Sequence, residues 1–302
     1  MVGQPSELAA AFSGRTGSGI LRLGATTVVP MDFDAPRPWW PLGDLVQMHE
    51  RVQHWIDRNW DTNITVGAWW ARLASAGLAA PTWDRHHGGL GATTRVQLLV
   101  EQRLAATGAI APPTVHPAIK LVGPALRQFA TEPQIKALLP RLLTGHDLWT
   151  VMMFDPGEHD AAATECRAEF DWKYVTIDGV KACDDHTADR ALALFRSGKE
   201  GREGLTWMVI DLADTSITRG DRTLEFRSMR TTHDRVIGTR DDGWALTKTS
   251  LPFIDRSIAG RIRRGLVHVQ PGAHAGNLDR TVADVLATHR RGLPPPIERR
   301  AR

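Results

Sequence analysis

The chain is poor in cysteine and has no long apolar run. Its 302 residues contain two cysteines, Cys166 and Cys183, with no companion pair at metal-ligand spacing. This excludes a disulfide framework and argues against a structural zinc site. No apolar segment approaches the roughly 20 residues that span a bilayer, and residues 1–30 lack the compact apolar stretch of a secretory signal. We therefore expect a cytoplasmic protein without a membrane partner.

Charge of one sign is also nearly absent, because the formal net charge is only +3. The basic excess lies near the end, at residues 261–264, 289–291 and 298–302. No aromatic residue is interleaved with these runs to stack on bases, so we expect a solvated basic tail at 291–302 and no nucleic-acid partner. The composition, 42% hydrophobic and 24% charged, is that of a globular protein.

The first half of the chain has the apolar spacing of helices. Residues Leu45, Met48, Val52, Trp55 and Ile56 fall on one helical face. Thr131 and Gln134 have the form of a capping box before an apolar helical pattern, and Gly145 is a suitable C-terminal stop. This spacing predicts an N-terminal helical domain over residues 31–146.

From Asp147 onward the pattern changes to short β-rich runs. They lie near residues 148–153, 172–177, 191–195, 205–212 and 223–229. Asp178-Gly179 has the form of a two-residue hairpin turn. A helical pattern resumes from Trp244 to about Val269 and again near residues 277–290. The order predicts an α+β protein with an antiparallel β-domain at 147–240 and a short C-terminal helical segment at 241–290.

Three segments resemble the acyl-CoA dehydrogenase family. The first two are WWARLASAGLAAPTWDRHHGGLG (69–91) and LVGPALRQFATEPQIKALLPRLLTGHDLW (121–149), which match the family's patterns nearly residue for residue. The third, MMFDPGEHDAA (152–162), stands where relatives carry S/T-E-P-G-A-G-S-D. The resemblance implies a helical domain, a β-domain and a C-terminal helical domain of four helices, most of which is absent here. Because many relatives begin at a Met-Asp-Phe like residues 31–33, residues 1–30 are expected to be a disordered extension.

The resemblance also implies a reaction. The family oxidises the Cα–Cβ bond of an acyl-CoA thioester: a carboxylate removes the α-proton and FAD accepts the β-hydride. An electron-transferring flavoprotein then takes the electrons. A member of this family acts in fatty acid or steroid degradation.

The positions that hold FAD in relatives carry other residues here. The implied cofactor-binding positions are Met153, Phe154, Gly157, Cys183 and Asp185. Phe154 replaces a hydroxyl donor, Cys183 replaces the tryptophan that packs on the flavin, and Asp184 or Asp185 replaces a Thr or Ser donor. An ionised carboxylate accepts hydrogen bonds and cannot donate them. These changes oppose FAD binding by this chain alone, and the alternative for the acidic residues is a solvated turn.

The implied catalytic base is Asp255. Relatives carry a Glu before an Arg in the first helix after the β-domain, and Asp255-Arg256 stands there, with Arg256 as the implied substrate-binding residue. The alternative is a surface acid beside a basic helix. Adjacent His86 and His87 lack a third ligand at fixed spacing, so no metal site is expected.

Three functions remain open on the sequence. The chain is a working dehydrogenase within an oligomer, a non-catalytic subunit of a hetero-oligomeric acyl-CoA dehydrogenase, or a truncated interaction module. An apolar stripe over residues 246–266 favours association with a homologous subunit, or else a homodimer.

Overall fold

The computed structural model describes residues 45–158, 160–183, 185 and 187–248. The extension expected at 1–30, the basic tail and most of the expected C-terminal helices lie outside these residues. The chain is helical again at residues 243–248, where the description ends. The bounds expected for the separate domains remain a prediction.

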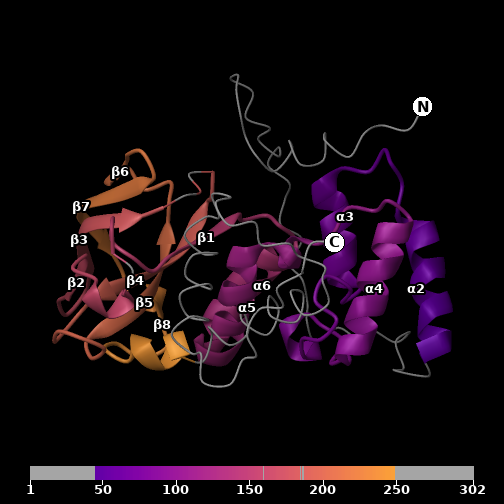
Figure 1. The fold of residues 1–302 in the computed structure, drawn as a ribbon, viewed down its shortest axis with the longest axis horizontal. Coiled ribbons are helices and arrows are strands. Elements are labelled where there is room, and N and C mark those ends of the chain that lie inside the picture. The colour runs from indigo at the N-terminus through magenta and orange to yellow at the C-terminus, as the bar shows by residue number, and fades with distance from the viewer. Residues whose placement is uncertain (1–44, 159, 184, 186, 249–302) are drawn as a thin grey trace, which may run out of the picture.

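The first half of the described chain forms five α-helices. They are α2 (Leu45–Asn59), α3 (Val66–Ser75), α4 (Thr94–Ala106), α5 (Pro117–Phe129) and α6 (Glu132–Leu143). In Figure 1, α2, α3 and α4 form one end of the molecule, and α5 and α6 lie between them and the sheet. No helix of the described residues is long and apolar enough to cross a membrane.

The helices form where the apolar spacing places them. Helix α2 buries Met48, Val52 and Ile56, whereas Leu45 at its start is 38% exposed. Helix α6 begins with the expected capping box, in which Gln134 Oε1 accepts the Thr131 N–H at 2.8 Å. Gly145 follows the helix with φ 63°, and an added Cβ there would lie 2.2 Å from the ring of Trp70. Only glycine fits this stop.

The second half forms one eight-stranded sheet. Its strands are β1 (Trp149–Met152), β2 (Arg167–Phe170), β3 (Val175–Ala182), β4 (Arg190–Arg196), β5 (Leu205–Asp211), β6 (Ile217–Arg219), β7 (Thr223–Thr231) and β8 (Val236–Ile237). The order is β6-β7-β3-β2-β4-β5-β8, with β1 also paired to β4. Most pairs are antiparallel as expected, but β1 and β2 each run parallel to β4. The parallel pairing of β1 follows from the long excursion through β2 and β3 that separates it from β4.

Strand β4 separates two hydrophobic cores. Leu192 and Leu194 join the core shared with the helices, while Ala191, Ala193 and Phe195 join a second core on the other face of the sheet. Strand β5 alternates in the same way. Because both faces are covered, these strands have nearly continuous apolar sequences.

The hairpin expected at Asp178-Gly179 was wrong. Both residues lie inside β3, where the register with β7 shifts at a β-bulge between Ile177 and Gly179. Asp178 Oδ1 accepts the N–H of Ser228 at 2.6 Å on the partner strand. Gly179 has φ 124°, and an added Cβ would lie 2.9 Å from the Cα of Cys166. The Asp-Gly pair therefore serves a bulge, which has the same need for a glycine backbone as a turn.

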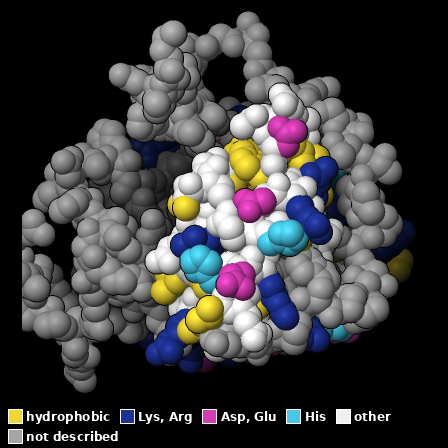
Figure 2. Space-filling view, turned by 90° about the vertical axis from the view of Figure 1, so that its right-hand side faces the viewer, with side chains coloured by type: hydrophobic (Ala, Val, Ile, Leu, Met, Phe, Trp, Pro, Cys, Tyr) yellow, Lys and Arg dark blue, Asp and Glu magenta, His cyan; other side chains and the backbone are white. Residues whose placement is uncertain are grey.

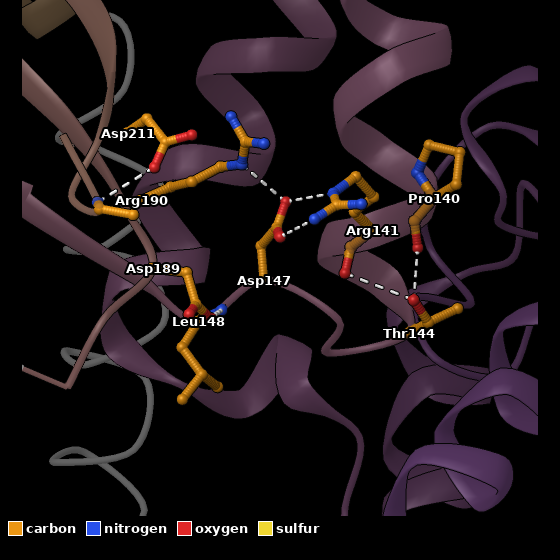
Figure 3. A network of polar contacts seen from close by, with 9 residues as sticks. Pro140, Arg141, Thr144, Asp147, Leu148, Asp189, Arg190 and Asp211 are labelled. Carbon is orange, nitrogen blue, oxygen red and sulfur yellow. Dashed lines mark hydrogen bonds and ion pairs between the residues drawn. The ribbon is translucent and has the colours of Figure 1, made fainter. Parts of the chain in front are cut away.

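A buried ion-pair network joins the helices to the sheet (Figure 3). Arg141 at the end of α6 binds both carboxylate oxygens of Asp147, and Arg190 Nε at the start of β4 lies 2.7 Å from Asp147 Oδ2. The Asp147 side chain is only 3% exposed. Burial raises the pKa of Asp147, but its contacts with Arg141 and Arg190 outweigh this and hold it below its usual value. The Leu148 N–H adds a 2.8 Å bond to Asp189 Oδ2, so the loop before β4 is fixed at its end.

The end of the molecule formed by α2 and α4 faces the viewer in Figure 2. Basic, acidic, histidine and apolar side chains are mixed over its described surface. This is the distribution of a solvated surface without a single-sign field.

Candidate functional site

Two segments that are distant in sequence meet at the end of the sheet. The first follows β1 and begins at Met153, and the second is the end of β3 and the loop after it. The N–H of Ala182 donates to the carbonyl of Phe154 at 3.0 Å. The two segments that carry the positions expected to hold a cofactor therefore meet at this bond.

A buried ion pair ties these segments together. Lys181 Nζ lies 2.8 Å from Asp155 Oδ1, and the Lys181 side chain has no solvent exposure. The ammonium also donates to Thr164 Oγ1 at 2.5 Å and to the Met153 carbonyl at 3.4 Å. All three of its protons therefore have acceptors.

The carboxylate of Asp155 is equally well occupied. It accepts from Thr164 Oγ1 at 2.7 Å and from the backbone N–H groups of Glu165 and Cys166 at 2.6 and 3.1 Å. Burial raises the pKa of Asp155, but the Lys181 ammonium and these donors outweigh it, so the net shift is downward. Burial lowers the pKa of Lys181, and the Asp155 carboxylate opposes that shift. The site thus contains an ion pair, Asp155 with Lys181, whose side chains are turned away from solvent.

The neighbouring positions of the first segment have separate environments. Phe154 packs its ring against the core shared with the helices. Gly157 has φ 81° and nothing within 4 Å of an added Cβ, so its backbone faces open space. Asp160 accepts the N–H of Ala162 at 2.9 Å and caps the short helix η3 (Ala161–Ala163).

The second segment buries its thiol and closes a turn on itself. Cys183 is 1% exposed, and its Sγ donates to the Asp185 carbonyl at 3.3 Å. Asp185 Oδ1 accepts from the N–H and the hydroxyl of Thr187 at 2.9 and 2.6 Å. Asp184 lies outside the described residues. The acidic turn that the sequence left as an alternative is present at Asp185, with its acceptor occupied.

The carboxylate of Asp185 acts electrostatically on the imidazole of His116. His116 precedes α5 and is partly buried. Burial lowers the pKa of His116, the carboxylate of Asp185 raises it and Lys120 lowers it further, with a net downward shift.

Comparison with known proteins identifies the fold and the family. Residues 47–146 match the model of the acyl-CoA dehydrogenase N-terminal domain. Acyl-CoA dehydrogenase IpdE1 of Mycobacterium tuberculosis is 31% identical over 202 residues, which are 62% of this chain and 52% of that protein. Residues 47–146 are an acyl-CoA dehydrogenase N-terminal domain, and these matches support a member of the acyl-CoA dehydrogenase family. FadE34 of the same organism, also an acyl-CoA dehydrogenase, is 27% identical over 199 residues. These residues are 59% of this chain and 27% of the length of FadE34. The match thus spans about half of IpdE1 and less of FadE34.

Solved structures have the same fold as this acyl-CoA dehydrogenase family member. A variant of the Tcur3481-Tcur3483 steroid ACAD superposes with a TM-score of 0.58 at 22% identity, covering 73% of this chain and 65% of that one. The ChsE4-ChsE5 complex from Mycobacterium tuberculosis gives 0.55 at 18% identity, covering 80% and 74%. Butyryl-CoA dehydrogenase from Megasphaera elsdenii gives 0.54 at 16% identity, covering 81% and 76%.

The side chains at the flavin positions of this acyl-CoA dehydrogenase family member do not fit FAD. Phe154 presents a ring without a donor, and the acceptor of Asp185 is filled by Thr187. The hydroxyl of Thr187 is itself used in that contact. Glu158, in the segment that stands in place of the family's A-G-S-D, adds an exposed carboxylate. No step of a reaction is therefore derived through FAD held by these residues.

The expected base lies outside the described residues, as do Arg256 and the apolar stripe beyond Lys248. The described residues contain no cluster of histidine, cysteine and acidic side chains that could hold a metal. His86 instead pairs with Glu132 at 3.2 Å, and His87 lies 3.5 Å from Asp84. The first contact joins the loop after α3 to α6, and the second lies within that loop.

Sequence reasoning missed Lys181 and Thr164. A lone lysine in the sequence does not reveal its partner, so no local signal pointed to this ion pair. Asp155 stands in the place of the Glu of E-P-G, and its carboxylate binds Lys181 and Thr164.

Proposed function

We propose that this chain is a subunit of a hetero-oligomeric acyl-CoA dehydrogenase, in which a homologous subunit holds FAD and supplies the catalytic base. The assembly would carry out α,β-dehydrogenation of an acyl-CoA thioester and pass electrons to an electron-transferring flavoprotein. This chain would contribute a contact surface that binds and positions the homologous subunit.

One observation carries this proposal: polar side chains at and beside the expected flavin positions make contacts within the protein. Asp155 binds Lys181, Cys183 binds the backbone of Asp185, and Asp185 binds Thr187. A site evolved to hold a cofactor leaves its donors directed at the ligand. Here the fold is kept while the donors are replaced, which fits a subunit under selection for assembly.

Two similar structures support the choice of partner. They are the Tcur3481-Tcur3483 steroid ACAD and the ChsE4-ChsE5 complex. Their identities of 22% and 18% establish the shared fold, and the assembly and a steroid-type thioester are carried to this chain as parts of the proposal.

The reaction sets what the partner must supply. The flavin supplies the hydride acceptor when bound, and a carboxylate must reach the α-proton. Within this chain, the ion pair of Asp155 and Lys181 would hold the segment after β1 and the end of β3 in a fixed position at the end of the sheet. Rigid loops present a constant surface to a partner and exclude water from the junction.

The test is reconstitution. The chain, a full-length homologue encoded beside it and their mixture are each purified, and flavin content, mass by light scattering and thioester-dependent dye reduction are measured. We expect a mixed oligomer with flavin and turnover only when the homologue is present. Turnover by this chain alone would overturn the proposal, and a stable monomer that gains no mass on mixing would exclude both the hetero-oligomer and a homodimer.

A second candidate is a catalytic subunit, favoured by the adjacency of Phe154 and Ala182 in the family's arrangement. In this case Asp255 is the proposed base and Arg256 binds substrate. Asp255→Asn removes the proton acceptor at nearly constant size, so turnover of the reconstituted assembly should fall about 10²-fold or more. Unchanged turnover would assign the base to the homologue, as the first candidate requires.

A further inference from the structure

A cleft opens between the start of α6 and the edge of the sheet, away from the loops described above. Its volume is about 690 Å³. None of its lining residues belongs to segments 153–158 or 181–187. Its apolar wall includes Pro133, Ala137, Leu138, Phe170 and Val209.

Arg235 stands at the boundary between this cleft and a smaller one. It lines both, and its side chain is partly buried. No ion pair or hydrogen bond joins its guanidinium to any other residue that the structure describes. A partly buried guanidinium with unused donors is a strong site for a carboxylate or phosphate.

The backbone around Arg235 is held in place from α6. The side-chain amide of Gln134 donates to the carbonyl of Asp234 at 2.6 Å and to that of Val236 at 2.8 Å. These two carbonyls flank Arg235. The cleft wall that carries the guanidinium is therefore fixed before any ligand arrives, which lowers the entropic cost of binding.

The net charge of the lining residues favours the larger of the two clefts as the site for an anion. The charged residues that line it are Arg235, Arg240 and Asp234, an excess of one positive charge. The carboxylate of Asp234 is engaged by the hydroxyl of Thr232. The smaller cleft has Arg230 and Arg235 against Asp211 and Asp214, which balance.

Arg240 forms the second cationic wall. Its guanidinium lies 4.4 Å from the centre of the Phe170 ring, and its Nε is 3.4 Å from Asp241 Oδ2. The ring and the two guanidiniums thus place positive charge beside apolar surface.

We propose that this cleft binds an amphipathic anion, with the anionic head on Arg235 and an apolar chain or ring against Ala137, Leu138 and Val209. This site goes beyond the proposed function, because it uses none of the residues assigned to the dehydrogenase assembly. Its ligand has the chemistry of a fatty-acid-like carboxylate, since one charge and a several-carbon apolar body match the cleft's single charge excess and its apolar wall.

The probe is decanoate, titrated into the full chain by calorimetry, with decyltrimethylammonium as a matched cation of the same chain length. Arg235→Gln should weaken decanoate binding at least about tenfold, the usual scale for losing a charge-assisted contact, and Arg235→Lys should retain much of it. Ala137→Trp fills the cleft from the exposed surface of α6 and should block binding. Lys136→Trp, on the same helix but outside the cleft, should leave it unchanged.

Each other outcome counts against the site. Equal binding of the cation and the anion would show adsorption to apolar surface. Decanoate binding that survives both Arg235→Gln and Ala137→Trp, or no binding up to the solubility of decanoate, would overturn the proposal. Neither result depends on turnover, so the test stands apart from that of the proposed function.

Discussion

The carboxylate of Asp155 lies 2.8 Å from the ammonium of Lys181, a side chain that solvent does not reach. The pair joins the segment after β1 to the end of β3, and it does so from inside the protein. Both partners are saturated with hydrogen bonds. The contact is thus structural, and its disruption should appear first in stability.

Asp155→Asn should strongly destabilise the chain. It leaves the Lys181 ammonium buried without a counter-charge, a change that costs about 3–5 kcal/mol in comparable buried pairs. Urea unfolding followed by circular dichroism measures the loss. A double replacement, Asp155→Leu with Lys181→Met, removes both charges and should recover most of it. A single variant as stable as the wild type would show that the pair is not formed.

Acid should weaken the fold through Asp155 and Asp147. The folded-state pKa of each is lowered from an ordinary value of 3.8, so the unfolded chain binds more protons at low pH. The resulting stability is present above about pH 5 and is lost as pH falls through 3.8 toward the folded pKa values. Urea midpoints measured from pH 6 downward should fall in this window, and Asp155→Asn should reduce the slope. A midpoint independent of pH there would contradict the assignment.

Gly179 should tolerate substitution less well than Gly201. Both have positive φ, but an added Cβ at Gly179 lies 2.9 Å from the backbone of Cys166, whereas at Gly201 it meets nothing within 4 Å. Gly201→Ala should cost about 1 kcal/mol from backbone strain alone, and Gly179→Ala about 2 kcal/mol or more. Equal losses in thermal unfolding would show that the bulge relaxes around the methyl group.

Asp147→Ala should loosen the contact between α6 and β4. The change leaves Arg141 and Arg190 facing each other without their shared carboxylate, at a cost of about 3–5 kcal/mol. Asp57→Ala, at an exposed position of α2, is the matched control and should change stability by no more than about 0.5 kcal/mol. Hydrogen exchange at the N–H groups of residues 189 and 190 reports the local effect, and unchanged protection there would refute the role of Asp147.

The helices could be predicted from the sequence, because their apolar spacing, capping box and terminal glycine are local signals. Strands β2, β6 and β8 were not predicted, since each is short and β2 has only Ala168 buried. The bulge at Gly179 was mistaken for a turn because both require a glycine backbone. The Asp155–Lys181 pair depends on residues 26 positions apart, and no local pattern reports such a pairing.

The candidate site was only partly accessible to sequence reasoning. The resemblance singled out Phe154 and Cys183, and the structure shows that their segments meet through the bond from Ala182 to Phe154. The contact of Asp185 with Thr187 could not be predicted, because the same acidic loop could have pointed its carboxylate at a ligand.

The central claim is that this chain does not hold FAD by itself, and direct titration tests it most closely. The purified chain is stripped of small molecules, FAD is added, and bound flavin is counted by its absorbance after gel filtration. The account predicts far less than one flavin per chain, rising toward one per pair only when the full-length homologue is added. Stoichiometric yellow protein from this chain alone would contradict it.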